Sequence, residues 1–179
     1  QKQTLVLWES KGEGGKAASP VVRFLLPQKE FEEKNGFDKT WKKNTIFDCS
    51  LSVDDSNKEV YDQYYNTASN IKLTSLLATD TVDVLITVPQ MFSYYTAQNA
   101  FLDLSSLLSE DLYEKLEKEN RLLTAIDGNG NKIHTGISLD DSYLSSKLPL
   151  SDGSSLSVCT DKNHPDVIQD FIKYCLWGN

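Results

Sequence analysis

The sequence DVLITVPQMFSYYTAQNAFLDLSSLL, from Asp83 to Leu108, decides which fold we expect for this chain. It opens with a short run of β-branched and apolar residues, which is typical of a buried strand. Pro89 follows at a position that suits the first turn of a helix, where no backbone N–H is needed. The helix carries Tyr94 and Tyr95 and ends at polar residues, after which AFLDL forms a docked turn. The segment therefore predicts a strand, a helix and a turn, and it carries no catalytic residue.

The chain before this segment also alternates between strand and helix patterns. Thr4–Trp8 is a β-branched and aromatic run that predicts a buried first strand. Asn44–Val53 alternates between polar and apolar residues, as a strand with one apolar face does. Ser56 and Glu59 form a capping box, and the apolar spacing that follows predicts a helix that ends near Ala78.

The chain after this segment contains a helix, a hairpin, a strand and a final helix. Ser109 caps the first of these, with Leu112 and Leu116 facing inward and charged residues facing solvent. The sequence DGNGN at 127–131 supplies the positive φ angles that a hairpin turn needs. The other expected elements are the hairpin strands Leu122–Ile126 and Lys132–Thr135, a strand at Ser154–Thr160 and a helix at Pro165–Trp177.

The composition is that of a single acidic domain spanning residues 1–179. Hydrophobic residues make up 39% of the 179 residues, which is enough for a substantial core. The 18 basic and 26 acidic residues argue against nucleic acid or an anionic membrane surface as partner, because both would repel the chain. No apolar run reaches the roughly 20 residues that span a bilayer. Since the chain begins with Gln1, we expect that an N-terminal piece has been removed, and this piece could have been a signal or an anchor.

The three cysteines, Cys49, Cys159 and Cys175, follow neither a metal-binding spacing nor a regular disulfide framework. An odd number leaves at least one thiol unpaired. We expect all three to behave as small buried hydrophobic residues. The alternative is one disulfide, for which Cys159 and Cys175 are the best candidates.

Three motifs resemble cofactor or metal sites, but each lacks a required part. Gly12–Ala17 has the spacing of a phosphate-binding loop, yet no helix pattern begins there. The 127–131 segment has the first ligand positions of a calcium loop, but Lys132 replaces its turn glycine. His134 and His164 have no second ligand at metal spacing. We therefore expect no metal and no cofactor.

Paired acids are the only residues in the sequence that suggest catalysis. Asp140-Asp141 and Asp54-Asp55 could act as acid and base or bind a cation. Both pairs lie at the edges of predicted elements, where Asp commonly caps helices and forms turns. The sequence contains no Gly-x-Ser-x-Gly motif. We expect a protein that is not an enzyme, with an enzyme that uses the Asp140-Asp141 region as an alternative.

Aromatic and polar residues at the ends of predicted strands are the candidates for ligand binding. In an open α/β sheet, the carboxyl ends of the strands form the crevice that holds a ligand. Trp8 could stack on a flat ligand, and Glu9 and Gln90 could form hydrogen bonds with it. Tyr94 is a further candidate. In the alternative interpretation Trp8 lies in the core, and Tyr94 and Tyr95 pack the helix on the sheet.

Several segments together resemble the extracellular solute-binding proteins of ABC transporters. In that family, the chain crosses into a second lobe after the segment that corresponds to GISL at 136–139. In this sequence only a short segment separates GISL from the next predicted strand, so we expect the second lobe to be missing. The segments that carry the resemblance are TLVLW (4–8), residues 71–77, DVL (83–85), NAFLDL (99–104), residues 123–137 and the closing helix.

The resemblance implies one lobe of a type 2 periplasmic-binding-protein fold. That lobe is a three-layer α/β/α domain with a mostly parallel mixed sheet. The function it implies is binding or interaction without chemistry, in a bacterial lipoprotein that is exported and anchored at the cell surface. Its partner would be a small solute or another protein there, with membrane contact only through the removed anchor. The alternative is capture of a solute, such as a sugar, by this lobe alone or by a dimer.

Overall fold

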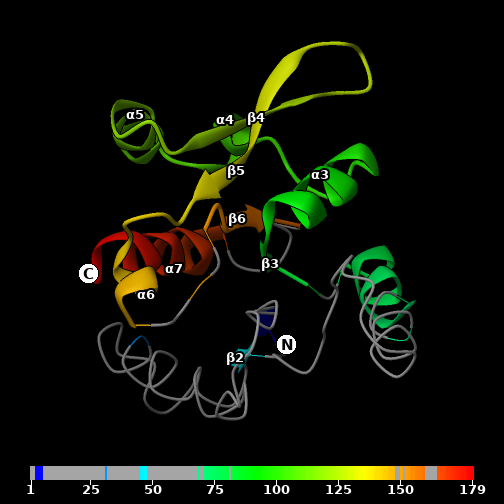
Figure 1. Ribbon diagram of the computed structural model, residues 1–179, viewed down its shortest axis with the longest axis horizontal. Helices are drawn as coiled ribbons and strands as arrows, with labels where there is room; N and C mark the ends of the chain where they lie inside the picture. Colours follow the sequence, from blue (N-terminus) through cyan, green and yellow to red (C-terminus); the bar gives the residue numbers. More distant parts are fainter. Residues whose placement is uncertain are drawn as a thin grey trace.

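The computed structural model describes residues 3–5, 31, 45–47, 68, 71–80, 82–147, 150, 152–159 and 165–179 (Figure 1). Residues 71–78 form a helix that precedes the labelled elements of the main sheet. The labelled elements are β1 (Gln3–Leu5), β2 (Thr45–Phe47), β3 (Val84–Thr87), α3 (Pro89–Ala97), α4 (Leu104–Leu107), α5 (Glu110–Lys118), β4 (Leu122–Ile126), β5 (Lys132–Ser138), α6 (Tyr143–Lys147), β6 (Ser155–Val158) and α7 (Pro165–Trp177).

The main sheet has four strands in the order β3-β6-β5-β4, and every neighbouring pair is antiparallel. The prediction of a mostly parallel sheet in a three-layer α/β/α domain is therefore wrong. Two features of the chain produce the antiparallel order: β4 and β5 are joined by a tight hairpin turn, and β6 runs against both β5 and β3. The described parallel pairing is confined to β1 and β2, which form a separate two-stranded sheet.

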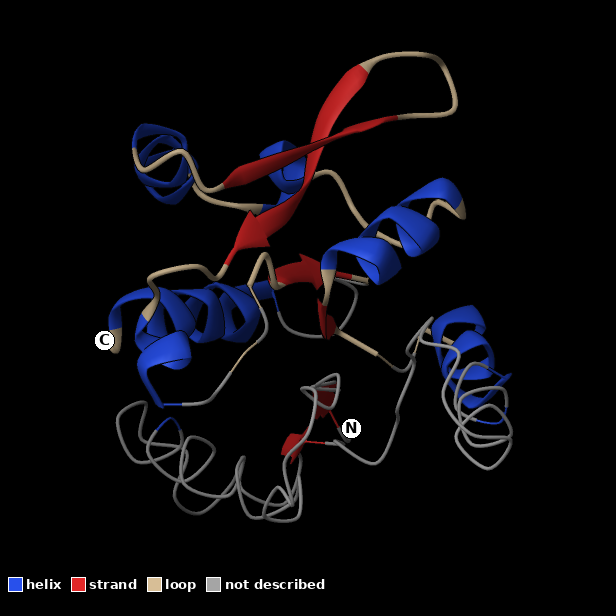
Figure 2. Cartoon of the chain, in the orientation of Figure 1, coloured by secondary structure: helices blue, strands red, loops and turns tan. Residues whose placement is uncertain are grey.

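Buried side chains form two hydrophobic clusters, which receive alternate residues of β3. Val84 and Ile86 of β3 belong to the larger cluster, whereas Leu85 belongs to the smaller one. The larger cluster also contains residues of α4, α5, α6 and α7, and the smaller cluster contains Met91 and Tyr95 of α3. Because successive strand side chains point to opposite faces, helices cover the sheet on both sides (Figure 2).

The local elements agree with most of the sequence predictions. Pro89 lies in the first turn of α3, and the Ser109 hydroxyl accepts a hydrogen bond from the Leu112 N–H at the start of α5. Helix α7 runs over Pro165–Trp177, as predicted. The predicted helix that ends near Ala78 is confirmed for residues 71–78. The capping box at Ser56 and Glu59 lies outside the described residues.

The disulfide considered between Cys159 and Cys175 is not formed, because both cysteines have free thiols. Cys175 is buried in the larger cluster, and Cys159 packs against the smaller one. Burial raises the pKa of both thiols, so both stay protonated at neutral pH. The two residues thus act as small hydrophobic residues. Cys49 lies outside the described residues.

A network centred on Arg121 holds the start of β4 against α5 and the β5–α6 turn. The guanidinium donates hydrogen bonds to Glu119 at 2.8 Å, to the Ser138 carbonyl at 3.1 Å and to the Asp140 carbonyl at 2.8 Å. Glu119 in turn accepts from the indole N–H of Trp177 at 3.2 Å. Arg121, the residue before β4, is therefore tied to the end of α5 and to the turn after β5, and through Glu119 it is linked to α7.

Glycines allow α3 to approach the sheet closely. A Cβ atom added to Gly136 of β5 would lie 2.5 Å from the ring of Phe92, and one added to Gly153 would lie 2.7 Å from Pro89. Both contacts are shorter than carbon atoms tolerate. Close packing of the first turn of α3 consequently requires glycine at both of these positions.

We predict that Gly136→Ala destabilises the protein by about 1–3 kcal/mol, because the added methyl group overpacks the contact with Phe92. The matched control is Gly128→Ala in the hairpin turn, where an added Cβ has no atom within 4 Å. Both substitutions reduce the freedom of the unfolded chain alike, so urea unfolding of the two variants isolates the packing effect. Equal stability of the two variants would contradict the close approach of α3.

Candidate functional site

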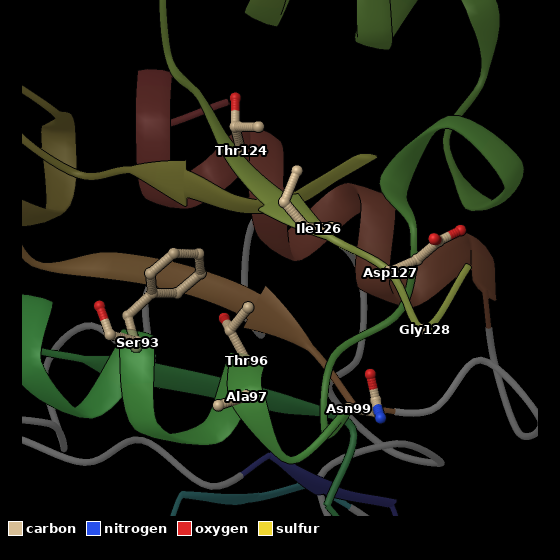
Figure 3. Close-up of a pocket in the computed structure, with 9 residues that line it drawn as sticks. Ser93, Thr96, Ala97, Asn99, Thr124, Ile126, Asp127 and Gly128 are labelled. Carbon is tan, nitrogen blue, oxygen red and sulfur yellow. The ribbon is translucent and has the colours of Figure 1, made fainter. Parts of the chain in front are cut away.

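A groove lies between α3 and the strand β4 (Figure 3). Its volume is about 380 Å³, and its walls combine hydroxyl and amide groups with apolar side chains. Nine residues line it: Phe92, Ser93, Thr96, Ala97 and Asn99 from α3 and its C-terminal end, and Thr124, Ile126, Asp127 and Gly128 from β4 and the hairpin turn. Among the described residues, the lining comes from α3, its C-terminal end, β4 and the hairpin turn, and none comes from β5.

The spacing of residues along α3 gives this helix one face in the core and another in the groove. Met91 and Tyr95 are buried against the sheet, whereas Ser93 and Thr96 lie on the neighbouring face of the helix, which lines the groove. Asn99 ends the helix with a φ of 55°, in the left-handed region that Asn tolerates. Its N–H donates to the Thr96 carbonyl at 3.0 Å. This ending places the Asn99 side chain at one end of the groove.

Asp127 forms the opposite wall and also shapes the hairpin turn. Its carboxylate accepts hydrogen bonds from the backbone N–H groups of Asn129 at 2.9 Å and Asn131 at 2.7 Å. These bonds, first of all the one from Asn131, lower the pKa of Asp127 below its ordinary value. The carboxylate is thus negative at neutral pH. Because the carboxylate oxygens accept hydrogen bonds from within the turn, the 127–131 segment is a hairpin tip, as the sequence predicted.

Several buried hydroxyl groups near α3 make no hydrogen bond within the described part of the chain. The hydroxyl of Thr96, which lines the groove, is one of them. Thr87 and Ser155 lie opposite each other on β3 and β6, and their hydroxyls are also buried without a partner. A buried hydroxyl without a partner has lost hydration without a compensating bond. The Thr96 hydroxyl is therefore an unpaired polar group behind the wall of the groove, and its oxygen is not exposed at the groove surface.

The Asp140-Asp141 pair, the candidate for an enzyme, lies beside a second hollow of about 430 Å³. The Asp140 carboxylate accepts a hydrogen bond from the Gly153 N–H at 2.9 Å, and Asp141 has a φ of 53°. Both residues thus support the turn after β5, as Asp does at element edges. The only described histidine, His134, has its Nδ1 atom 2.6 Å from the hydroxyl of Tyr113 and contacts no nucleophile.

Two of the four predicted ligand residues are described, and neither lines the groove. Gln90 and Tyr94 are exposed on α3, and Tyr94 packs edge-on against Tyr95 at 5.2 Å between ring centroids. Trp8 and Glu9 lie outside the described residues. A ligand role for these four residues stays a prediction. The groove residues were not predicted, although polar Ser93, Thr96 and Asn99 recur every third residue and mark one side of α3.

Comparisons with protein-family models, with curated proteins and with solved structures found no match. Among the described residues, no group of three or more His, Cys, Asp or Glu side chains is arranged to hold a metal ion. None of the described helices has the length and apolar character needed to cross a membrane.

We predict that Asp127 titrates with a midpoint below 3.8, measured by NMR of its side-chain carboxyl carbon. Because the pKa in the folded state is lowered, the stabilisation is present above the unfolded pKa of about 3.9 and is lost as pH falls through the folded value. The wild-type melting temperature should therefore fall more steeply than that of Asp127→Asn as the pH is lowered below about 4. A midpoint at or above 3.8 would contradict the bonding assigned to the turn.

Proposed function

We propose that this protein is a binding or interaction domain without enzymatic activity, and that the groove between α3 and β4 is its binding surface. The proposal rests chiefly on the chemistry of the groove. Its nine lining residues offer hydroxyl, amide and apolar groups, and they include one ionised side chain, Asp127. Such a lining can hold and orient a partner, but it contains no pairing of a nucleophile with a base.

The described cysteines and the described histidine support the same proposal. Burial keeps the thiols of Cys159 and Cys175 protonated, which removes them as nucleophiles. His134 is bonded to Tyr113, on α5, rather than to a serine, threonine or cysteine. A base that activates a nucleophile must lie within hydrogen-bond reach of it. The binding role is consequently favoured over catalysis.

Export and anchoring at the cell surface belong to the same proposal and rest on the sequence resemblance to solute-binding proteins. In that family two lobes close around a solute. The groove described here is formed within a single unit by a helix and a hairpin, so it requires no second lobe. A partner at the cell surface could therefore bind it directly.

A small solute is the second candidate for the ligand, and two observations favour it. The groove volume of about 380 Å³ is within the range of pockets that hold small molecules. The exposed side chains of Ser93 and Asn99 present a hydroxyl and an amide group on the helix side of the groove. A solute rich in hydroxyl groups could form hydrogen bonds with them.

A thermal-shift screen with sugars, amino acids, short peptides and metal salts tests the proposal. A ligand that binds only the native state raises the melting temperature, so we expect at least one of these classes to do so. Ala97→Trp should abolish that shift, because Ala97 lines the groove and the indole would fill it. The matched control is Glu114→Trp, which adds the same ring to the exposed face of α5 and should keep the shift.

The pattern of responses separates the candidates. A shift by peptides alone supports an interaction domain, and a shift by sugars or amino acids supports solute capture. A shift that survives Ala97→Trp places binding outside the groove. No shift in any class would refute the groove as a binding surface, and turnover of an ester or phosphoester substrate would refute the absence of enzymatic activity.

A further inference from the structure

We infer that two copies of this chain associate through their β4 strands, in antiparallel register about Thr124. The inference concerns the same surface as the proposed function, since β4 forms one wall of the groove. Within the described part of the chain, β4 is an edge strand that pairs with β5 only. The hairpin of β4 and β5 projects beyond the neighbouring helices (Figure 1). Its outer edge is thus available to a second strand.

The backbone hydrogen bonds at the two ends of β4 show which residues face this free edge. The Arg121 carbonyl accepts from the Ser138 N–H at 2.7 Å, and the Asp127 N–H donates to the Asn131 carbonyl at 2.9 Å. Both odd-numbered residues therefore turn their backbone groups toward the hairpin partner. Because backbone groups alternate along an antiparallel strand, Leu122, Thr124 and Ile126 turn theirs away from β5. Each offers one donor and one acceptor to a new strand.

The free edge lacks the features that normally prevent strands from pairing between molecules. Proteins protect such edges with charged residues or proline in the edge strand. The sequence of β4 is LLTAI, which contains neither. Thr124 is exposed, and the side chain of Ile126 is 61% exposed. A large apolar residue on an unprotected edge favours a partner that covers it.

The sequence around β4 is complementary to itself when two copies run antiparallel. With Thr124 opposite Thr124 of the second copy, Leu122 lies opposite Ile126, and Leu123 lies opposite Ala125. The charged residues at the two ends, Arg121 and Asp127, then face each other. Apolar residues thus meet apolar residues, and opposite charges meet at both ends.

Charge also selects the antiparallel direction over the parallel one. Parallel pairing would bring the two Asp127 carboxylates together, and a carboxylate is negative at neutral pH. Antiparallel pairing moves them to opposite ends of the interface. The attraction between Arg121 and Asp127 itself is small, since Glu119 already neutralises the guanidinium and exposed ion pairs contribute little. The direction therefore follows mainly from avoided repulsion.

Sedimentation equilibrium of the full chain tests the inference directly, with a monomer–dimer equilibrium as the expected result. Thr124→Lys should weaken dimerisation about fivefold or more, because it places two like charges opposite each other. The matched control is Thr74→Lys, which makes the same change on the exposed face of the helix at residues 71–78 and should leave the dimer intact. Mixing Thr124→Lys with Thr124→Glu should restore association, as opposite charges then meet.

Cysteine pairing tests the register. Residues opposite each other in an antiparallel pair have Cα atoms about 4.5–5.5 Å apart, which a disulfide can bridge. Leu122→Cys mixed with Ile126→Cys should therefore form a disulfide-linked heterodimer under mild oxidation, whereas either variant alone should give no more crosslink than the wild-type chain.

Three results would overturn the inference: a chain that stays monomeric at every concentration, a dimer that Thr124→Lys leaves unchanged, or mixtures that neither reassociate nor crosslink. None of these measurements uses a ligand of the groove. A monomeric chain that still responds in the thermal-shift screen therefore removes this inference alone, and an unresponsive dimer removes only the proposed function.

Discussion

Pairing of β6 with β3 is the interaction on which the rest of the structure depends. It joins Val84–Thr87 to Ser155–Val158, residues that are far apart in the sequence and buried along their whole length. The neighbouring backbone extends the link, because the Cys159 N–H donates to the Asp83 carbonyl and the Leu102 N–H to the Val158 carbonyl, both at 2.8 Å. Strand β3 carries side chains into both hydrophobic clusters and β6 into the larger one, so the helices on either face have a common support.

The central position of β6 also determines where the groove lies. Helix α3 packs closely on Gly136 of β5 and on Gly153, which precedes β6. The face of α3 that does not contact these glycines lines the groove beside β4. Substituting bulkier residues for these glycines would lift the helix and change the width of the groove. The unpaired hydroxyls of Thr87 and Ser155 lie opposite each other on β3 and β6. Small side chains at this interface thus permit close packing but leave hydrogen-bonding capacity unused.

The sequence predicts the elements well because their signals are local. Pro89, Ser109 and the DGNGN turn each act on residues within a few positions, and the structure confirms a helix start, a cap and a hairpin there. The direction of strand pairing is not local. The apolar run of β3 would look the same beside a parallel neighbour, and nothing in Ser155–Val158 states that this strand runs against it. The mostly parallel sheet came from the family resemblance, and the error lies there.

The candidate site could not be predicted for the same reason. Ser93, Thr96 and Asn99 share one side of α3, which their spacing reveals, but the groove exists only because the β4–β5 hairpin passes beside that side. Its position depends on the bulge between Leu123 and Thr124 and on the Arg121 network at the start of β4. Both fix the hairpin relative to the sheet, and neither has a signature in the local sequence. Strand β4 carries no charged residue that would protect its edge, and its Ile126 side chain is exposed. An exposed isoleucine contributes little to packing within the domain. A partner strand that covers it therefore explains the sequence of β4 better than packing within one chain does.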